Sequence, residues 1–480
     1  MLACRVLSEK SLVHNVLISR YSHALVLSKG EDCLYPPIVD MSKEGQKRHN
    51  RQLWYDSIKA MPTVEQKLYE LAVQQRMKLK KFLFTSVPQT YVAVPLNQYI
   101  TRTHFVDSLP ERLLKMNVDN ELNDIKSTLC DTLLKYYYNP WAKNKSNKLD
   151  DYLNEKEAGS KLVNMLISQC YKKLAVKNDY ILESMIQQKP RVSSFWWHSG
   201  FDSENDKIFE KNLCFQYQDY PAFVIRMKKP LPPIVSLDDP LCATAEVPDY
   251  NYHPEAFGNA NKRCYSIASV PGYWPGDPFE FPFLLVNTSD ILNRLLRKIQ
   301  NYNLKKIEDS VAIMSSFAWL NAVATYQGFT PFHDVSYPIV THVILTNGQD
   351  WNFYVYQLNT IAFHSDVDKK DRRNICWSSG KMRLFDTVED GQIKGINDEV
   401  FKLLLKCLLN APYLQDNLVL KPYLGADDRS KEERETMRFF LRRMNSRAPD
   451  PQAFKEETPT WARIYKYHPD APPSPLLKLY

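Results

Sequence analysis

The chain has 480 residues, enough for two or three domains, and 44% of them are hydrophobic, which supports a substantial core. Glycine is scarce, with 13 residues, so the glycine-rich loops that cradle phosphates in nucleotide-binding enzymes are not expected. The net charge is only +7, and the nine scattered cysteines include no CxxC pair, which argues against a disulfide-stapled domain and a cysteine zinc site. No apolar run approaches the roughly 20 residues of a membrane span.

The first 30 residues differ in composition from the rest of the chain. They carry four basic residues and many serines and leucines, and Glu9 is their one acidic residue. A basic, serine-containing, acid-poor segment is typical of a mitochondrial transit peptide, and a frayed N-terminal helix is the alternative. The sequence therefore predicts a targeting leader over residues 1–30.

Residues 31–185 are predicted to form a mainly helical, basic region. Within it, residues 43–81 contain ten basic and four acidic residues and include a capping box of Thr63 and Gln66. After Pro62, the apolar stripe from Val64 to Leu79 predicts a basic amphipathic helix, with Lys67 and Lys81 off the stripe. Such a helix either presents a solvated charged face or contacts nucleic-acid phosphates, and the candidates for phosphate contact are Lys78, Lys80 and Lys81.

Residues 186–412 are predicted to form a mixed α/β core. Its aromatic and β-branched stretches predict strands, and proline-rich segments connect them. Residues 310–410 predict a compact succession of helix, three strands and helix, with Asn347-Gly348 as a hairpin turn. The strand after this turn is apolar on both faces and is expected to be central. The expected fold class is α+β, with a helical N-terminal half and extended tails.

The sequence contains no GxSxG, P-loop or HExxH motif. The NGQDW hairpin is similar to that of restriction-type nucleases, but residues 356–359 replace the carboxylate-x-lysine strand that their metal requires. Three carboxylates, Asp366, Asp368 and Asp371, are crowded by basic residues and are interpreted as a solvated loop. We therefore expect no enzyme, no cofactor and no metal.

Residues 413–480 are predicted to form a basic helix followed by an extended tail. The helix covers residues 431–447, with one apolar stripe and a series of arginines. Arginine side chains bind phosphates bidentately, although they could instead pair with the glutamates of the same helix. We expect the 310–410 core to complete itself without this tail. The predicted phosphate contacts are Arg434, Arg438, Arg442 and Arg443.

Six short blocks carry a resemblance to a known family. They are YPPIV at 35–39, PQT at 88–90, ATYQGF at 324–329, YQLNT at 356–360, RNICW at 373–377, and KG with ND at 394–398. In this order they resemble the animal mitochondrial ribosomal protein family formerly called small-subunit protein thirty, or programmed cell death protein nine. The resemblance runs from about residue 35 to about residue 412, and the tail departs from it.

The resemblance implies a structural protein of the large mitochondrial ribosomal subunit, located in the matrix and without catalytic residues. It also implies pairing with a related protein, large-subunit protein thirty-seven. Mitochondrial rRNA and neighbouring ribosomal proteins are the expected partners. Two alternatives stay open: a nuclease-like enzyme with a degenerate site, and a matrix RNA-binding assembly factor that leaves the finished particle.

Overall fold

The computed structural model describes residues 40–74, 80–85, 93–137, 148–201, 212–250, 252–257, 261–263, 268–288, 304–368, 371–389, 391–415 and 418–446. The predicted leader over residues 1–30 lies outside these ranges. The chain divides into two compact units, Met1–Trp54 and Tyr55–Tyr480. In the first unit, the described residues 40–54 contain the start of helix α2, where the Ser42 hydroxyl accepts a hydrogen bond from the Gly45 backbone N–H.

The helix predicted after Pro62 begins at Val64 as expected, but its continuation to Lys81 is wrong, because Lys80 and Lys81 belong to a strand. Helix α2 (Lys43–Ala60) ends before Pro62, helix α3 (Val64–Gln74) follows, and Lys80 already belongs to strand β1 (Lys80–Phe84). A proline disfavours the helical conformation of the residue before it, which explains the break after α2. The predicted capping box is confirmed, because the Thr63 hydroxyl contacts both the Gln66 side chain and the Gln66 backbone N–H.

Two long helices pair in the N-terminal half. Helix α6 (Asp119–Tyr137) packs on helix α7 (Lys148–Leu174), and buried leucines of both helices join one hydrophobic cluster. The cluster also contains helix α12 (Asp398–Leu409), whose predicted position is confirmed and whose first turn is capped by the Asn397 side chain. The short helices of this region are α4 (Ala93–Ile100), α5 (Glu111–Leu114) and α8 (Asp179–Leu182).

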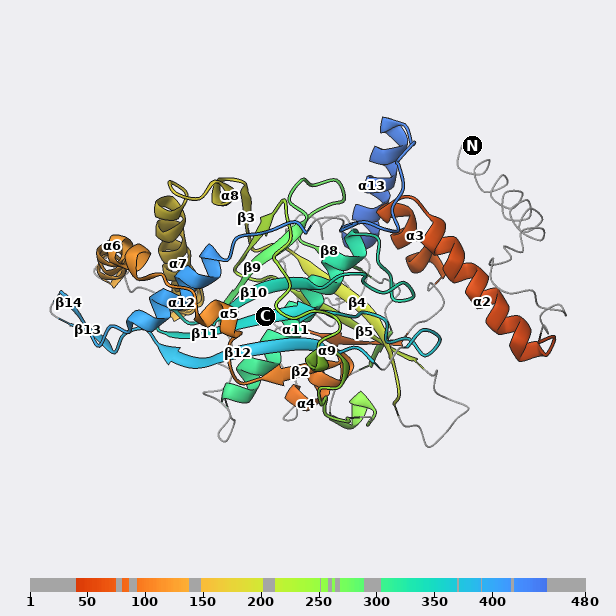
Figure 1. Ribbon diagram of the computed structural model, residues 1–480, viewed down its shortest axis with the longest axis horizontal. Coiled ribbons are helices and arrows are strands. Elements are labelled where there is room, and N and C mark those ends of the chain that lie inside the picture. Colours follow the sequence, from red (N-terminus) through yellow and green to blue (C-terminus); the bar gives the residue numbers. More distant parts are fainter. Residues whose placement is uncertain are drawn as a thin grey trace, which may run out of the picture. The chain divides into compact units, whose positions relative to one another are not determined.

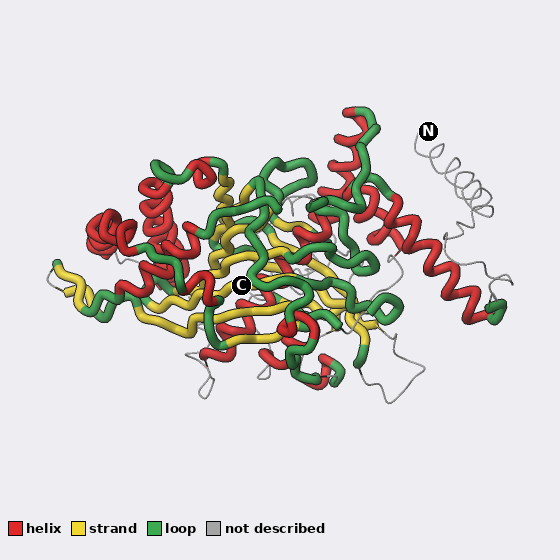
Figure 2. The backbone as a smooth tube through the Cα atoms, viewed as in Figure 1, coloured by secondary structure: helices red, strands yellow, loops and turns green. Residues whose placement is uncertain are grey.

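A seven-stranded sheet forms the centre of the second unit (Figures 1 and 2). Its order is β2-β12-β11-β10-β9-β6-β3, with parallel pairing at β2–β12 and β9–β10 and antiparallel pairing elsewhere. The predicted Asn347-Gly348 hairpin joins β10 to β11 and is confirmed, with Gly348 at a φ of 96°. The strands are β2 (Thr103–Val106), β3 (Ser184–Gln188), β6 (Phe223–Met227), β9 (Phe281–Thr288), β10 (Ile339–Thr346), β11 (Asp350–Leu358) and β12 (Asn374–Arg383).

The two faces of this sheet contribute to two different hydrophobic clusters. On β10, Val340 and Ile344 join the cluster with α6, α7 and α12, while Ile339 and Val343 join the cluster with helix α11 (Leu304–Tyr326). This alternation follows from the two-residue period of a strand. Strand β11 is central and buried, as expected from its apolar faces.

Helix α11 contacts strands of both large sheets. The second sheet has the order β7-β1-β5-β4-β8, and β1 pairs parallel with β5. Because α11 meets a sheet on more than one side, almost all of its circumference is buried, including polar residues such as Asp309, Ser316 and Asn321. The remaining strands of this sheet are β4 (Val192–Ser199), β5 (Asn212–Asp219), β7 (Asn261–Arg263) and β8 (Val270–Pro271).

The expected α+β class is confirmed, with helices in the N-terminal half and a sheet-rich C-terminal region. The domain boundaries stay predictions, although strands from both sides of the 185/186 boundary share sheets: β2 pairs with β12, and β1 pairs with β5. The smaller elements are α9 (Pro240–Ala243), a 3-10 turn (Pro254–Phe257), the hairpin β13 (Thr387–Glu389) and β14 (Gln392–Lys394), and helix α13 (Lys431–Ser446). No helix in the described ranges is both long and apolar enough to span a membrane.

Cysteine side chains of the described core are buried. Cys170, Cys214, Cys242, Cys376 and Cys407 carry free thiols inside the two hydrophobic clusters or at their margins, and Cys130 is half-buried. Burial raises the pKa of the Cys170 thiol to about 12 and that of the Cys242 thiol to about 11. These thiols are therefore structural, as the scattered cysteine pattern suggested.

Candidate nucleic-acid and protein interface

Lys81, one of the predicted phosphate contacts, lies inside the protein. It is 1% exposed, because β1 is flanked by β5 on one side and β7 on the other. Its ammonium donates to the Gln216 side-chain oxygen at 3.4 Å. In this fold Lys81 does not reach a phosphate at the surface, so its assignment is wrong. Lys78 and the side chain of Lys80 lie outside the described residues.

The predicted arginines of α13 divide into two groups. Arg438 donates to the backbone oxygen of Pro275 at 3.4 Å, so it docks the helix onto the protein. Arg434 is exposed, and its Nε donates to the backbone oxygen of Arg429. The side chains of Arg442 and Arg443 lie outside the described residues. The alternative to phosphate contact was that these arginines pair with glutamates of their own helix. Glu433 instead exchanges capping hydrogen bonds with Ser430.

Residues 418–438, which we call the C-terminal strap, pack on the core instead of extending from it. The Tyr337 hydroxyl donates to the Leu420 backbone oxygen at 2.9 Å, and Lys421 forms an ion pair with Glu280. Leu424 lies against Gly328 so closely that a Cβ at that glycine would come within 2.6 Å of it. The strap therefore packs on the fold, and the expectation that the core completes itself without the tail is tested by deletion of residues 413–480.

The same strap contacts the N-terminal helices α2 and α3. The Gly425 backbone N–H donates to the Pro62 oxygen at 3.0 Å, in the turn between these helices. Farther along, Arg429 forms ion pairs with Glu65 at 3.2 Å and with Asp427 at 2.7 Å. These contacts join segments more than 350 residues apart in sequence.

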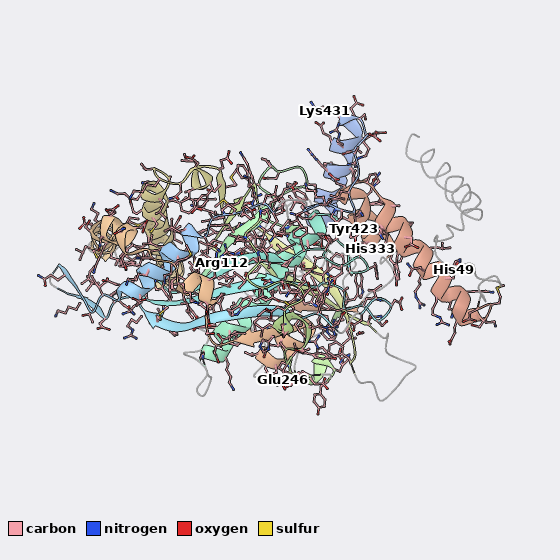
Figure 3. All side chains as sticks on the ribbon, in the orientation of Figure 1. His49, Arg112, Glu246, His333, Tyr423 and Lys431 are labelled. Carbon is pink, nitrogen blue, oxygen red and sulfur yellow. The ribbon has the colours of Figure 1, made fainter. Side chains whose placement is uncertain are left out.

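Tyr423 is the centre of this junction. Its ring packs against Phe329 and His333, and Tyr423 and His333 are seen close together in Figure 3. The ammonium groups of Lys59 and Lys67 lie 5.3 and 5.9 Å from the same ring centroid. An aromatic face attracts cations, so the strap holds two lysines of α2 and α3.

Lys67 is the unexpected member of this group, because its position in the helical pattern predicted a solvent-facing side chain. It is 2% exposed, and its ammonium donates to the Lys59 backbone oxygen at 3.0 Å. Burial, with a smaller contribution from the charge of Lys59, lowers the pKa of Lys67 to about 8. Burial and the same two lysines lower the pKa of His333 to about 4, so this imidazole is neutral at physiological pH.

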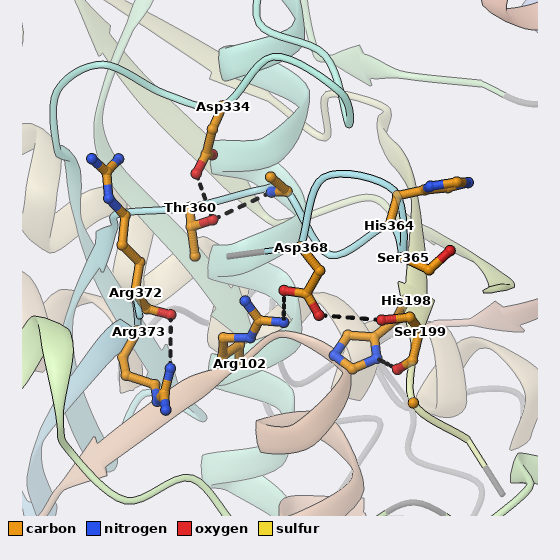
Figure 4. A network of polar contacts seen from close by, with 12 residues as sticks. Arg102, His198, Ser199, Asp334, Thr360, His364, Ser365, Asp368, Arg372 and Arg373 are labelled. Carbon is orange, nitrogen blue, oxygen red and sulfur yellow. Dashed lines mark hydrogen bonds and ion pairs between the residues drawn. The ribbon is translucent and has the colours of Figure 1, made fainter. Parts of the chain in front are cut away.

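A second polar network surrounds Asp368 (Figure 4). Asp368 forms an ion pair with Arg102 at 2.6 Å, with both side chains 9% exposed, and accepts a hydrogen bond from Ser199. The interpretation of residues 366–371 as a solvated loop is therefore wrong for Asp368. Arg102 has a φ of 47°, unusual for a residue other than glycine, and its guanidinium lies over the Phe363 ring. The network fixes the turn between α4 and β2 to the loop after β11.

Within the part of the chain that the structure describes, this network shows no catalytic arrangement. The Nδ1 of His198 is engaged with the Ser199 backbone oxygen at 2.6 Å, so it does not activate the Ser199 hydroxyl. Burial, assisted by Arg102, lowers the pKa of His198 to about 4. His198 is neutral and faces a backbone carbonyl, and the Asp368 carboxylate is bound to Arg102. Both side chains therefore serve structure rather than proton transfer.

The place that a nuclease would use for metal is also structural. Gln357 accepts hydrogen bonds from the backbone N–H groups of Ile234 and Val235 and donates to the Val235 oxygen. Asn359 donates to the Arg373 backbone oxygen. Amides here satisfy buried backbone groups, and the described residues contain no cluster of carboxylate, histidine and cysteine side chains able to hold a metal.

The family described as mitochondrial 28S ribosomal protein S30 (PDCD9) matches residues 3–412 of the chain. The chain belongs to this family. It is accordingly a mitochondrial ribosomal protein with a structural, non-enzymatic role, and the resemblance seen in the sequence blocks is confirmed. The match ends at residue 412, so the C-terminal strap lies beyond it.

The chain is also similar, at low sequence identity, to a curated relative. Large ribosomal subunit protein mL37 of Rattus norvegicus is 22% identical over 293 residues, which are 60% of this chain and 62% of the relative. The matched part is thus less than two thirds of the relative's own length. The family description uses the 28S particle and the relative's name uses the large subunit, so the two names disagree about the subunit.

The strap and the Arg102–Asp368 pair were not recognised as sites from sequence. A signal for the strap was present, since Leu418, Leu420, Tyr423 and Leu424 interrupt an otherwise polar segment with apolar side chains that pack on the core. The ion pair gave no local signal, because its two residues are 266 positions apart.

Proposed function

We propose that this protein is a structural constituent of the large subunit of the mitochondrial ribosome, working in the matrix. The family match over residues 3–412 carries the proposal, and the name of the relative mL37 favours the large subunit over the small one. The interior supports a structural role, because Gln357, at the position where a nuclease would bind metal, forms hydrogen bonds with buried backbone groups.

Contact with mitochondrial rRNA is a further part of the proposal. Arg434 is exposed on α13, and the sequence places Arg442 and Arg443 farther along the same helix. Arginine that reaches solvent on this helix can bind phosphates without sequence preference. Lys78, Lys80 and Arg438 stay candidates, whereas Lys81 is withdrawn because it is buried in the protein.

Pairing with the relative named large-subunit protein thirty-seven, mL37, is also proposed. Its support is the family resemblance and the sequence similarity between the two chains. Such paired relatives would bury surface against each other within the particle.

Sedimentation tests the proposed function. A tagged chain is followed in gradients of mitochondrial lysate after the ribosomal subunits are separated by magnesium removal. We expect the tag to migrate with the large subunit. Migration with the small subunit would overturn the subunit assignment. Presence only in immature particles would favour the assembly factor.

A further inference from the structure

We propose that strand β3 is a docking edge, along which an extended segment of another protein adds a strand to the seven-stranded sheet. This inference rests on the proposed function, since it assigns a partner contact to a ribosomal protein. In the described part of the chain, the sheet ends at β3 on one side and at β2 on the other (Figure 1).

The two ends of the sheet differ in their cover. At the β2 end, His104 contacts the Glu246 backbone oxygen at 2.7 Å and Arg373 donates to the Ala245 oxygen, so the 245–246 segment lies beside that edge. Strand β3 pairs with β6 on its inner side only. A sheet edge presents N–H and C=O groups that another strand can pair with.

Strand β3 also lacks the usual protection of an edge. Its sequence, SMIQQ, contains no lysine, no proline and no charge, and its register with β6 is unbroken over all five residues. Soluble proteins protect exposed edges with charges, prolines or bulges. The ends of the second large sheet, by comparison, are the three-residue β7, which contains lysine and arginine, and the two-residue β8, which ends in proline.

Apolar side chains are exposed on both faces of β3. Met185 is 39% exposed and Ile186 is 41% exposed, and consecutive strand residues point to opposite faces. A helix or an RNA groove laid on one face would cover only one of them. A strand added in the plane of the sheet places side chains beside both, because its own residues alternate in the same way.

The apolar surface continues past the Ser184 end of the strand. The Tyr413 backbone N–H donates to the Pro230 backbone oxygen. Pro230 lies three positions after Met227, the β6 residue that pairs with Ser184. The exposed apolar side chains at this end are Leu182, Tyr413 and Leu414. Surface of this kind on a ribosomal protein fits a protein neighbour better than a phosphate backbone, which needs cations.

Charge at the two ends of β3 defines the partner further. Lys189 follows one end, and Lys228 and Lys229 flank the other, where Glu183 pairs with Lys228. The docked segment would therefore be apolar and uncharged over about five residues and acidic beyond them. Parallel pairing of β3 with a second copy would bring Lys189 against Lys189, so the proposal commits to a segment of a different protein.

A site-specific crosslink tests the inference. A photoreactive benzoylphenylalanine replaces the exposed Gln188 in the full chain, and large subunits are isolated and irradiated. We expect a crosslink to an extended peptide of another ribosomal protein. A crosslink to rRNA, a crosslink to a second copy, or no crosslink in particles that contain the chain would overturn the proposal. If the unmodified chain does not migrate with the large subunit, the proposed function fails instead.

A charge-insertion pair gives an independent readout. Met185→Lys with Ile186→Lys protects the edge, while Val419→Lys adds charge to an exposed apolar residue of the strap and is the control. We expect the double variant alone to enter the large subunit about tenfold less well, because a charge buried at an interface without a partner is unfavourable. The thermal midpoint of the isolated chain should stay unchanged. Normal incorporation of the double variant, or equal loss in the control, would contradict the proposal.

Discussion

At the scale of single residues, two buried cations show how the fold treats charge. Lys67 has hydrogen-bond and aromatic partners but, among the described residues, no carboxylate within ion-pair distance of its ammonium, and its pKa is lowered. Arg102 is buried to a similar extent and has a carboxylate partner, Asp368. Burial of the Lys67 ammonium destabilises the folded state, whereas Arg102 is stabilised by its carboxylate partner. Substituting Lys67 should therefore raise the free energy of unfolding, and substituting Arg102 should lower it.

Replacing Lys67 with methionine should stabilise the protein. The folded pKa of about 8 lies below the ordinary value of 10.5, so the cost of burying the ammonium is fully present below pH 8 and disappears above pH 10.5. We expect Lys67→Met to raise the free energy of unfolding at pH 7 by about 2 kcal/mol, since each pKa unit corresponds to about 1.4 kcal/mol and lost contacts offset part of the gain.

Denaturant unfolding from pH 6 to pH 10.5 measures this effect. The difference between wild type and Lys67→Met should shrink as the pH rises from 8 toward 10.5, while the exposed control Lys229→Met should differ little from wild type throughout. Destabilisation by Lys67→Met at pH 7 would show that the contacts of the ammonium outweigh its burial.

Removing one member of the Arg102–Asp368 pair should destabilise the fold. Arg102→Met leaves a carboxylate that is nine-tenths buried, and the expected loss is about 3 kcal/mol in unfolding free energy. The double variant Arg102→Met, Asp368→Asn should lose less than the sum of the two single changes, because no charge is left buried.

The exposed pair Lys115–Glu111 on α5 is the matched control for this cycle. Both of its side chains are largely in solvent, so Lys115→Ala should change stability by about 0.5 kcal/mol or less. Additive effects of the two changes at Arg102 and Asp368 would mean that the pair is not coupled.

At the scale of elements, the strap contacts both the core and the turn between α2 and α3. One close approach to the core is at Gly328, which has a φ of 93° and faces the Leu424 side chain. A side chain at Gly328 would be disfavoured both by the left-handed backbone and by the Leu424 side chain. Substituting a second glycine that has a similar φ but open space around it measures the backbone effect alone.

Gly328→Ala should loosen the strap, whereas Gly391→Ala should not. Gly391 has a φ of 75° and open space around it, so its substitution should cost only the backbone term of about 1–2 kcal/mol. We expect Gly328→Ala to lose more stability than this and to increase hydrogen exchange in residues 55–74. Equal effects of the two substitutions would show that the Leu424 contact is unimportant.

How far the sequence predicted these elements depends on the range of the contacts that specify them. The Asn347-Gly348 hairpin and helix α12 follow from local signals, a turn dipeptide and a helical period, and both were predicted. The first two residues of β1 were mistaken for helix because they continue a basic stretch, and β1 gains its partner from β5, more than 130 positions away. Lys81 is buried beside Gln216 of that strand and Lys67 beside Tyr423 of the strap, so no local pattern could reveal the burial of either lysine.

At the scale of the whole molecule, the two large sheets combine strands from distant parts of the chain. The seven-stranded sheet extends from residue 103 to residue 383, and β1 from the N-terminal region lies inside the second sheet. Contacts so distant in sequence must form before either sheet is complete, and folding is correspondingly slow. Truncations that divide these strands should therefore be damaging.

Expression of truncated chains tests this expectation. Residues 186–412 alone lack β1, β2, the first two residues of β3 and the strap, so we expect no cooperative thermal transition, whereas residues 55–446 should unfold in one cooperative step. Deletion of 413–480 should lower the thermal midpoint and hasten proteolysis. A cooperative transition in the 186–412 fragment would show that it is an independent domain.

The buried cysteines make the folded chain slow to react with thiol reagents. A thiolate is the reactive species, and burial keeps the pKa of the Cys170 and Cys407 thiols near 12, so few thiolates are present at neutral pH. Cys170 lies on α7, Cys376 on β12 and Cys407 on α12, so each would be alkylated only when its own element opens. Cys4, Cys33, Cys130 and Cys264 can be replaced by serine, and alkylation can then be measured separately at Cys170, Cys376 and Cys407. The three rates would report local unfolding of α7, β12 and α12, respectively.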